Sequence, residues 1–213
     1  RSSDLLDQIE TILSQNLELT SDRLIDNKLS LHLDKTESII FGPTRKVKNA
    51  KLSISCKGEV IEQKQVVKYL GLSIDTSLSG DITAKEIISK CSKRLRFLYR
   101  NANCLDIHTK KLLCQSLIQS HYDYACSSWH SSVSATLKHK LQTNQNKMVR
   151  FILGKGPREH VGFNELDSLK WLNVEKRGMQ IKLSNMHKIV YLKSPQYLTD
   201  KFNKYVYRHR YQT

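Results

Sequence analysis

Apolar residues recur at helical spacing through residues 3–25, where Leu or Ile returns every third or fourth position. Ser2 or Ser3 stands ahead of this segment and is a natural N-cap, because a serine oxygen can accept a hydrogen bond from the first helical turn. The period therefore predicts one amphipathic helix at the start of the sequence.

The period then changes to two, which is typical of strands. Leucines alternate with polar residues over residues 29–33, as in a half-buried strand. Residues 38–41 form a second short apolar run, and Gly42 and Pro43 end it. Both segments are predicted to be strands.

Three more strand-like segments follow. Residues 52–55 and 60–62 are short, and Lys57 and Gly58 between them suit a hairpin turn. Residues 66–74 are a longer apolar run and are predicted to form one more strand.

From residue 80 onward the pattern is helical to the end of the sequence. The predicted helices cover about residues 81–102, 107–124, 133–153 and 174–192. We therefore expect an α+β protein. Residues 1–79 would form a small antiparallel strand region with one helix, and residues 80–213 an all-helical bundle.

Charge divides the chain at the same place. The net charge is +15. Residues 1–79 carry 11 basic and 11 acidic residues, whereas residues 80–213 carry 24 basic and 9 acidic ones. A basic part joined to a neutral part indicates that the basic part faces a polyanion such as nucleic acid. A solvated surface is the alternative.

The helix predicted over residues 81–102 has one apolar face and one cationic face. Its apolar stripe consists of Ala84, Ile88, Cys91, Leu95 and Leu98. Its cations, which fall within an arc of about 80° on an ideal helix, are Lys85, Lys93, Arg96 and Arg100. A single sign of charge on this arc makes these four residues the candidates for nucleic-acid binding. The helix over residues 133–153 repeats the pattern, with Lys138, Lys140, Lys147 and Arg150 off its apolar stripe.

The cysteines and histidines predict neither disulfides nor a metal site. Five cysteines are an odd number and include no CxxC pair, which favours a reducing intracellular compartment, the nucleus or the cytoplasm. No histidine lies at a spacing from cysteine that would build a zinc site. We expect buried thiols and surface imidazoles. No apolar run approaches the length of a membrane span, so no membrane partner is expected.

Two segments in the first part resemble motifs of a known family. Residues 27–37, NKLSLHLDKTE, followed by residues 39–41, are similar to the N-x-L-x-L-N-x-x-K-T motif of reverse transcriptases from LINE-type, non-LTR retrotransposons. Residues 67–75, VKYLGLSID, resemble the Y-L-G-x-x-(I/L)-D segment that follows it there. In that family these are the D motif of the palm and the E-motif hairpin called the primer grip.

Further matches continue in the same order. The segment 116–129, SLIQSHYDYACSSW, resembles S-L-I-x-S-x-x-x-Y-(G/A)-x-x-x-W, and LQTNQN at residues 141–146 resembles the start of the L-Q-x-x-Q-N helix. Residues 169–177 and 195–198 match later segments of the same enzymes. The resemblance covers about residues 27–200, and the Jockey and CR1 elements are the nearest in character.

The resemblance implies roles for several residues. Residues 1–79 would be the end of the palm and residues 80–213 the thumb and downstream helices. Lys35 and Thr36 would belong to the D motif, where the lysine assists pyrophosphate departure, although an ordinary edge-strand lysine is the alternative. Tyr69, Leu70 and Gly71 would lie at the primer grip, or else form plain strand core. The partner would be an RNA or DNA template–primer duplex; the sequence leaves the oligomeric state unknown.

Polymerisation needs carboxylates that hold two metal ions, and this sequence contains no Asp-Asp pair. In the family the first helix follows that pair, so the sequence is expected to begin just past the catalytic residues. The parent RNA-directed DNA polymerase would use Mg²⁺, whereas this chain is expected to hold no cofactor and to be inactive alone. The alternative is a transposon-derived nucleic-acid-binding or scaffold protein without enzymatic activity.

Other chemistry is less specific in this sequence. Ser120, His121, Asp123 and Tyr124 contain hydrolase-type groups, but no nucleophile elbow surrounds the serine. Trp129 and Trp171 favour core anchors over base-stacking platforms. The tail is basic and aromatic and could bind single strands; its residues are Tyr205, Tyr207, Arg208, His209 and Arg210.

Overall fold

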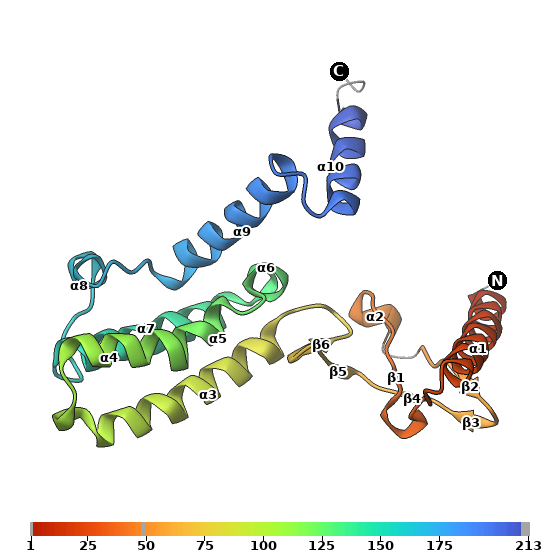
Figure 1. Ribbon diagram of the computed structural model, residues 1–213, viewed down its shortest axis with the longest axis horizontal. Coiled ribbons are helices and arrows are strands. Elements are labelled where there is room, and N and C mark those ends of the chain that lie inside the picture. Colours follow the sequence, from red (N-terminus) through yellow and green to blue (C-terminus); the bar gives the residue numbers. More distant parts are fainter. Residues whose placement is uncertain (1, 48–49, 210–213) are drawn as a thin grey trace. The chain divides into compact units, whose positions relative to one another are not determined.

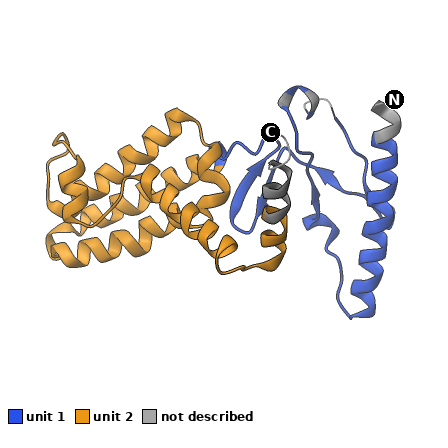
Figure 2. Cartoon of the chain, turned by 90° about the horizontal axis from the view of Figure 1, so that it is seen from above, with its two compact units in different colours: residues 1–82 blue, residues 83–213 orange. Residues whose placement is uncertain are grey.

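The computed structural model describes residues 2–47 and 50–209. The chain divides into two compact units, Arg1–Ile82 and Thr83–Thr213 (Figure 2). The charge and the hydrophobic period of the sequence place this division between residues 79 and 80. The described part is mostly helical with small sheets, which agrees with the α+β class. The assignments to palm and thumb stay predictions.

The first unit joins a long helix to short strands (Figure 1). Helix α1 spans Ser2–Asp26 and confirms the prediction for residues 3–25. The other elements are α2 (Thr44–Val47), β1 (Glu37–Ser38), β2 (Ser55–Cys56), β3 (Glu59–Val60), β4 (Glu62–Gln63), β5 (Val66–Tyr69) and β6 (Leu72–Asp75).

The strands pair as three separate two-stranded sheets. Strands β2 and β3 are antiparallel, and Lys57 and Gly58 turn between them with φ of 51° and 83°. Two central residues with positive φ are typical of the tight hairpin turn that matches strand twist. The predicted hairpin is therefore confirmed. The strands are shorter than the apolar runs that predicted them.

Strands β1 and β4 are parallel, so the expectation of a wholly antiparallel arrangement is wrong. Glu37 and Glu62 stand in register across this pair. The ammonium of Lys64 lies 2.6 Å from the Glu37 carboxylate and 3.2 Å from that of Glu62. Hydrogen bonds to these two carboxylates raise the pKa of Lys64. Because one cation contacts both facing carboxylates, it offsets part of their like-charge repulsion.

Two of the strands predicted from the sequence are also wrong. Residues 29–33 form no strand; Leu33–Lys35 is a short 3-10 turn, closed by the bond from the Thr36 N–H to the Leu33 oxygen. This turn uses backbone groups that a strand would offer to a neighbour. The run 66–74 is a hairpin of β5 and β6 rather than one strand, because Leu70 and Gly71 form a turn with φ of 46° and 83°. A hairpin here is what the resemblance implies.

The core of the first unit is small. Ile54, Cys56 and Ile61 are buried, and a few half-buried leucines pack against them. Helix α1 attaches by hydrogen bonds from the Ser53 N–H to Glu10 and from the Ser55 N–H to Ser14. Much of the α1 apolar surface stays exposed, including Ile12, Leu13, Leu19 and Ile25.

This small core predicts unequal stability of the two units. We expect limited proteolysis to cut within residues 1–79 well before residues 80–190, because local opening is easiest where few apolar side chains are buried. Mass spectrometry of a time course will locate the first cuts. Early trimming of the second unit with an intact first unit would contradict this expectation.

The second unit is a helical bundle (Figure 1). Helices α3 and α7 confirm the predicted segments 81–102 and 133–153, and α9 confirms 174–192. The predicted segment 107–124 is α4 and α5, joined by a π-helical stretch at Gln115–Gln119. Helices α6, α8 and α10 were not predicted. The bounds are α3 (Asp81–Arg100), α4 (Ile107–Cys114), α5 (Ser120–Asp123), α6 (Cys126–Trp129), α7 (Ala135–Leu153), α8 (Phe163–Ser168), α9 (Val174–Val190) and α10 (Gln196–His209).

The core of this unit surrounds α7, whose Leu141, Met148, Val149 and Ile152 are fully buried. Helix α3 adds the expected stripe with one change, since Ile87 is buried and Ile88 is half-buried. The remaining buried residues of the stripe are Ala84, Cys91, Leu95 and Leu98. None of the helices in the described ranges is long and apolar enough to cross a membrane.

The five cysteines are free, and four of them are buried as expected, whereas Cys104 is exposed. Burial raises the pKa of the thiols of Cys91 and Cys114 to about 12. The expectation of surface imidazoles is wrong for His130, which is buried against Gly178. A Cβ at position 178 would lie 2.8 Å from His130 Nδ1, so the missing side chain makes room for the ring. Burial lowers the pKa of His130.

Candidate nucleic-acid interface

Helix α3 presents its four candidate cations to solvent. Lys85, Lys93, Arg96 and Arg100 are all exposed, and the buried stripe lies on the other side of the helix. Within the part of the chain that the structure describes, none of these four forms an ion pair or a side-chain hydrogen bond. The neighbouring Lys90 differs, since it pairs with Glu86 on the same helix at 3.9 Å. The four cations are therefore available to an outside anion.

Helix α7 borders this face. The Asn144 amide donates to the Ser92 hydroxyl at 2.7 Å, and the Tyr99 hydroxyl donates to the Lys147 backbone oxygen at 3.3 Å. The rings of Tyr99 and Phe151 meet edge to face with centroids 4.9 Å apart. Lys140 and Lys147 lie one helical turn to either side of Asn144, and both are exposed. They therefore extend the cationic face from α3 onto the edge of α7.

Two other arginines of the bundle have structural partners instead. Arg94 donates to the Leu117 backbone oxygen at 2.5 Å and contacts the His121 ring. Arg150 donates from Nε to the Glu159 backbone oxygen at 2.7 Å. The sequence pattern places Lys140, Lys147 and Arg150 alike, off the apolar stripe of their helix. The structure distinguishes them: among the described residues, Arg150 has a structural partner, whereas the side chains of the two lysines have none.

In the first unit, the structure brings together residues from the two motif-like segments. Lys35 and Tyr69 both line a hollow of about 510 Å³, together with Glu37, Phe41 and Ile74. One wall is the face of the β5–β6 hairpin, and the other is the segment that follows the Leu33–Lys35 turn. More than thirty residues separate Lys35 from Tyr69 in the sequence, so only the structure shows that they line the same hollow.

The hairpin tip is exposed rather than core. Tyr69 is 63% and Leu70 72% exposed, so the strand-core interpretation is wrong for both. Leu70 holds a left-handed φ of 46° that bulky side chains rarely adopt. Gly71 suits its φ of 83°. Thr36 is half-buried and donates its hydroxyl to the His32 backbone oxygen at 3.0 Å.

The segment 116–129 has structural contacts and no hydrolase geometry. The Ser120 hydroxyl donates to the Ser116 backbone oxygen at 2.6 Å. The Asp123 carboxylate is held by Arg177 of α9 through two hydrogen bonds of 3.1 Å and 2.9 Å. These bonds raise the pKa of Arg177. Trp129 is buried and donates its indole N–H to the Tyr124 oxygen at 3.0 Å, which confirms a core anchor.

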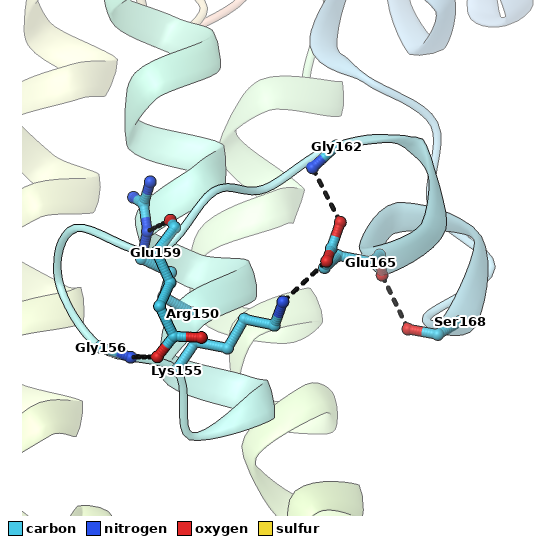
Figure 3. Close-up of polar contacts among 7 residues, drawn as sticks. All are labelled: Arg150, Lys155, Gly156, Glu159, Gly162, Glu165 and Ser168. Carbon is cyan, nitrogen blue, oxygen red and sulfur yellow. Dashed lines mark hydrogen bonds and ion pairs between the residues drawn. The ribbon is translucent and has the colours of Figure 1, made fainter.

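The loop between α7 and α8 is held by polar contacts (Figure 3). The Glu165 carboxylate accepts from the Lys155 ammonium at 2.7 Å and from the Gly162 N–H at 2.8 Å. The Glu159 carboxylate accepts from the Gly156 N–H at 2.5 Å. The Lys155 contact and the backbone N–H groups lower the pKa of Glu165 to about 2. Glu165 is thus charged at neutral pH and fixes the start of α8.

Two remaining expectations concern the tail and metals. The side chains of the basic-aromatic tail, from Tyr205 to Arg210, lie outside the described residues. Across the described ranges, no group of three or more His, Cys, Asp or Glu side chains is placed to hold a metal ion. Comparison with models of protein families, with curated proteins and with solved structures finds no match.

Proposed function

We propose that this chain binds a template–primer duplex by its phosphates, as part of a non-LTR retrotransposon reverse transcriptase, and that it does not itself catalyse polymerisation. The observation that carries this proposal is the cationic face of α3, with Lys140 and Lys147 of α7 at its edge. Six exposed cations of one sign lie on two packed helices. Such a face attracts a polyanion whatever its sequence.

The physical argument concerns charge and rigidity. Phosphate contacts release condensed counterions from the duplex, and this release supplies much of the binding free energy. Exposed Lys and Arg side chains stay largely hydrated when they contact a phosphate, so the desolvation cost of binding is small. The buried stripe of α3 fixes the backbone that carries them, so the cations keep their spacing along the helix.

Two features of the first unit fit the same function. Lys35 and Tyr69, which the resemblance assigns to the D motif and the primer grip, line one hollow. Tyr69 and Leu70 are exposed at a hairpin tip, where a nucleic-acid strand could reach them. The role of these residues at a primer end is carried by the resemblance.

In the second unit, the structure gives a physical reason for the residue types at several motif positions. Ala125 holds a left-handed φ of 47°, where a small residue fits best, and the matching family position is Gly or Ala. The amides of the LQTNQN segment are bonded inside the bundle, as Gln145 is to the Leu172 oxygen at 2.9 Å. These positions support the resemblance through structure rather than through chemistry.

The test is fluorescence anisotropy with labelled RNA–DNA and DNA duplexes over a range of salt. Six phosphate contacts predict a slope of log K against log[salt] of about −5. A slope near zero would contradict phosphate binding. In parallel, primer extension with Mg²⁺ should give no product, and any templated incorporation by the pure chain would refute the expected inactivity.

A further inference from the structure

A second cavity of about 340 Å³ lies within the helical unit, and its lining includes no residue of α3. It is formed by α7, by the start of α8 and by the segment that leads into α9. Its apolar walls include Trp171, which is half-buried, and Phe163, which is 74% exposed. Its polar lining includes Asn146, Asn173 and Lys176. The cavity therefore joins aromatic surface to a few polar groups, as small-molecule sites do.

The orientation of each amide in this lining is fixed by the backbone. The Val174 N–H donates to the Gln142 side-chain oxygen at 2.9 Å, so the Gln142 nitrogen must face Asn146. That nitrogen donates to the Asn146 oxygen at 2.8 Å. The Asn173 oxygen likewise accepts from the Lys176 N–H at 2.8 Å. Since a backbone N–H can only donate, neither asparagine can flip without losing a hydrogen bond.

The cavity consequently offers donors. Within the described residues, the amide nitrogens of Asn146 and Asn173 donate to no protein group, and Lys176 forms no ion pair. No residue of the lining, all of which is described, is acidic. Two amide donors and an ammonium suit a ligand that presents acceptors, and the two rings suit a flat aromatic body.

Hydrogen bonds also preorganise the lining of this cavity. Glu165 accepts from the Gly162 N–H and from Lys155 (Figure 3), which fixes the backbone that leads into Phe163. The backbone N–H of Trp171 donates to the Leu166 backbone oxygen at 2.8 Å and closes the turn after α8. A lining that is ordered beforehand loses little conformational entropy when a ligand binds.

We propose that this cavity binds a single unstacked nucleotide, with its base against Trp171 and Phe163, base acceptors on the two amides, and phosphate on Lys176. The choice of a nucleotide rests on the proposed nucleic-acid function. On the edge that carries N7, guanine presents two adjacent acceptors, O6 and N7, whereas adenine presents the N7 acceptor beside the N6 amino donor. Fixed donors that meet this edge therefore favour guanine over adenine, although both bases are purines with the same ring system.

The test uses tryptophan fluorescence of the full chain, titrated with GMP, AMP and ribose 5-phosphate. Base–aromatic stacking should quench the fluorescence of Trp171. The Trp171→Phe variant measures the signal of Trp129 and the light absorbed by the ligand, and both are subtracted. We expect saturable quenching by GMP, with AMP about tenfold weaker, the equivalent of one lost hydrogen bond. No saturation up to about 10 mM GMP, or equal affinity for GMP and AMP, overturns the proposal.

The variants distinguish base recognition from simple charge attraction. Asn173→Asp keeps the oxygen that caps α9 and replaces the donor with an anion, so GMP affinity should fall about tenfold or more. Asn164→Asp makes the same change on the exposed surface of α8 outside the lining and should leave affinity unchanged. Equal losses in both variants, or ribose 5-phosphate binding as tight as GMP, would leave only charge attraction and overturn the proposal.

These results are separable from the proposed function. Duplex binding is measured by anisotropy and depends on α3, whereas GMP binding is measured at Trp171. Selective GMP binding without duplex binding would sink the proposed function and leave the nucleotide site standing. Duplex binding without selective GMP binding would do the reverse.

Discussion

Replacement of Lys85, Lys93, Arg96 and Arg100 together by glutamine will lower duplex affinity on the order of 10³-fold near 0.1 M salt. Each exposed charge contact with a phosphate contributes about 1 kcal/mol in water, and four such contacts correspond to about a thousandfold in affinity. The slope of log K against log[salt] should become shallower by about 3 to 4, roughly one for each lost contact. Anisotropy titrations at four or more salt concentrations measure both quantities.

The control variant removes the same number of charges elsewhere. Lys28, Lys51, Lys188 and Lys201 are all exposed. Their replacement by glutamine lowers the net charge of +15 by the same four units, so a purely general attraction would weaken equally in both variants. We expect the control to lose less than about tenfold, because salt screens solvent-exposed charges that do not contact a phosphate. Equal losses would contradict a localised binding face.

Folding should not confuse this comparison. The four residues of α3 are exposed, and the packing of the helix depends on buried residues such as Cys91 and Leu95. Surface substitutions away from packed or bonded groups change stability by about 0.5 kcal/mol or less. Matching thermal unfolding curves for the variant and the original chain will confirm that binding, and not folding, has changed.

The face of α3 was predictable because helical periodicity is local. Once residues 81–102 are taken as a helix, the angle per residue places Leu95 inside and Arg96 outside without any tertiary contact. The bounds of α7 and α9 follow from the same periodicity. What the sequence does not contain is the packing order of these helices, and so the addition of Lys140 and Lys147 to the face required the structure.

The strand region was less predictable because pairing is non-local. The alternation at residues 29–33 gives the right inward direction for Leu31 and Leu33, which pack against the small core, but no strand forms there. The parallel pairing of β1 with β4 brings Glu37 beside Glu62 and Lys64, which are remote from it in sequence. Positive φ at Leu70 could not be expected from a leucine, since only Gly71 signals the turn.

The candidate cavity beside Trp171 shows a different limit. The sequence favoured a core anchor for both tryptophans, and this holds for Trp129, whereas Trp171 is only half-buried. The LQTNQN segment matches a family motif, but the sequence does not show which way each side-chain amide is oriented. Their roles follow from which backbone N–H groups they accept, such as that of Val174, and those contacts cross the fold.

The second large effect concerns Asn144, a buried amide at the centre of the helical bundle. The Tyr122 hydroxyl donates to the Asn144 oxygen at 2.9 Å, and the Asn144 nitrogen donates to the Ser92 hydroxyl at 2.7 Å. One amide thereby ties together α5, α7 and α3. Asn144 and Tyr122 are 3% and 4% exposed, so water does not replace either bond readily.

Asn144→Leu will destabilise the bundle by about 2 to 3 kcal/mol, because the buried Tyr122 hydroxyl loses its strong acceptor and keeps only the Cys91 thiol, a weak partner. Urea unfolding followed by tryptophan fluorescence measures this, since Trp129 and Trp171 both lie in the helical unit. Tyr122→Phe removes the stranded hydroxyl and should cost about 1 kcal/mol alone. The double variant should cost less than the sum of the two by about 1 kcal/mol, because the second change removes a hydroxyl that the first left poorly paired. Strict additivity would show that Asn144 contributes by its volume and not by its hydrogen bonds, and a stabilising role for the buried amides of the LQTNQN segment would then fail at Asn144.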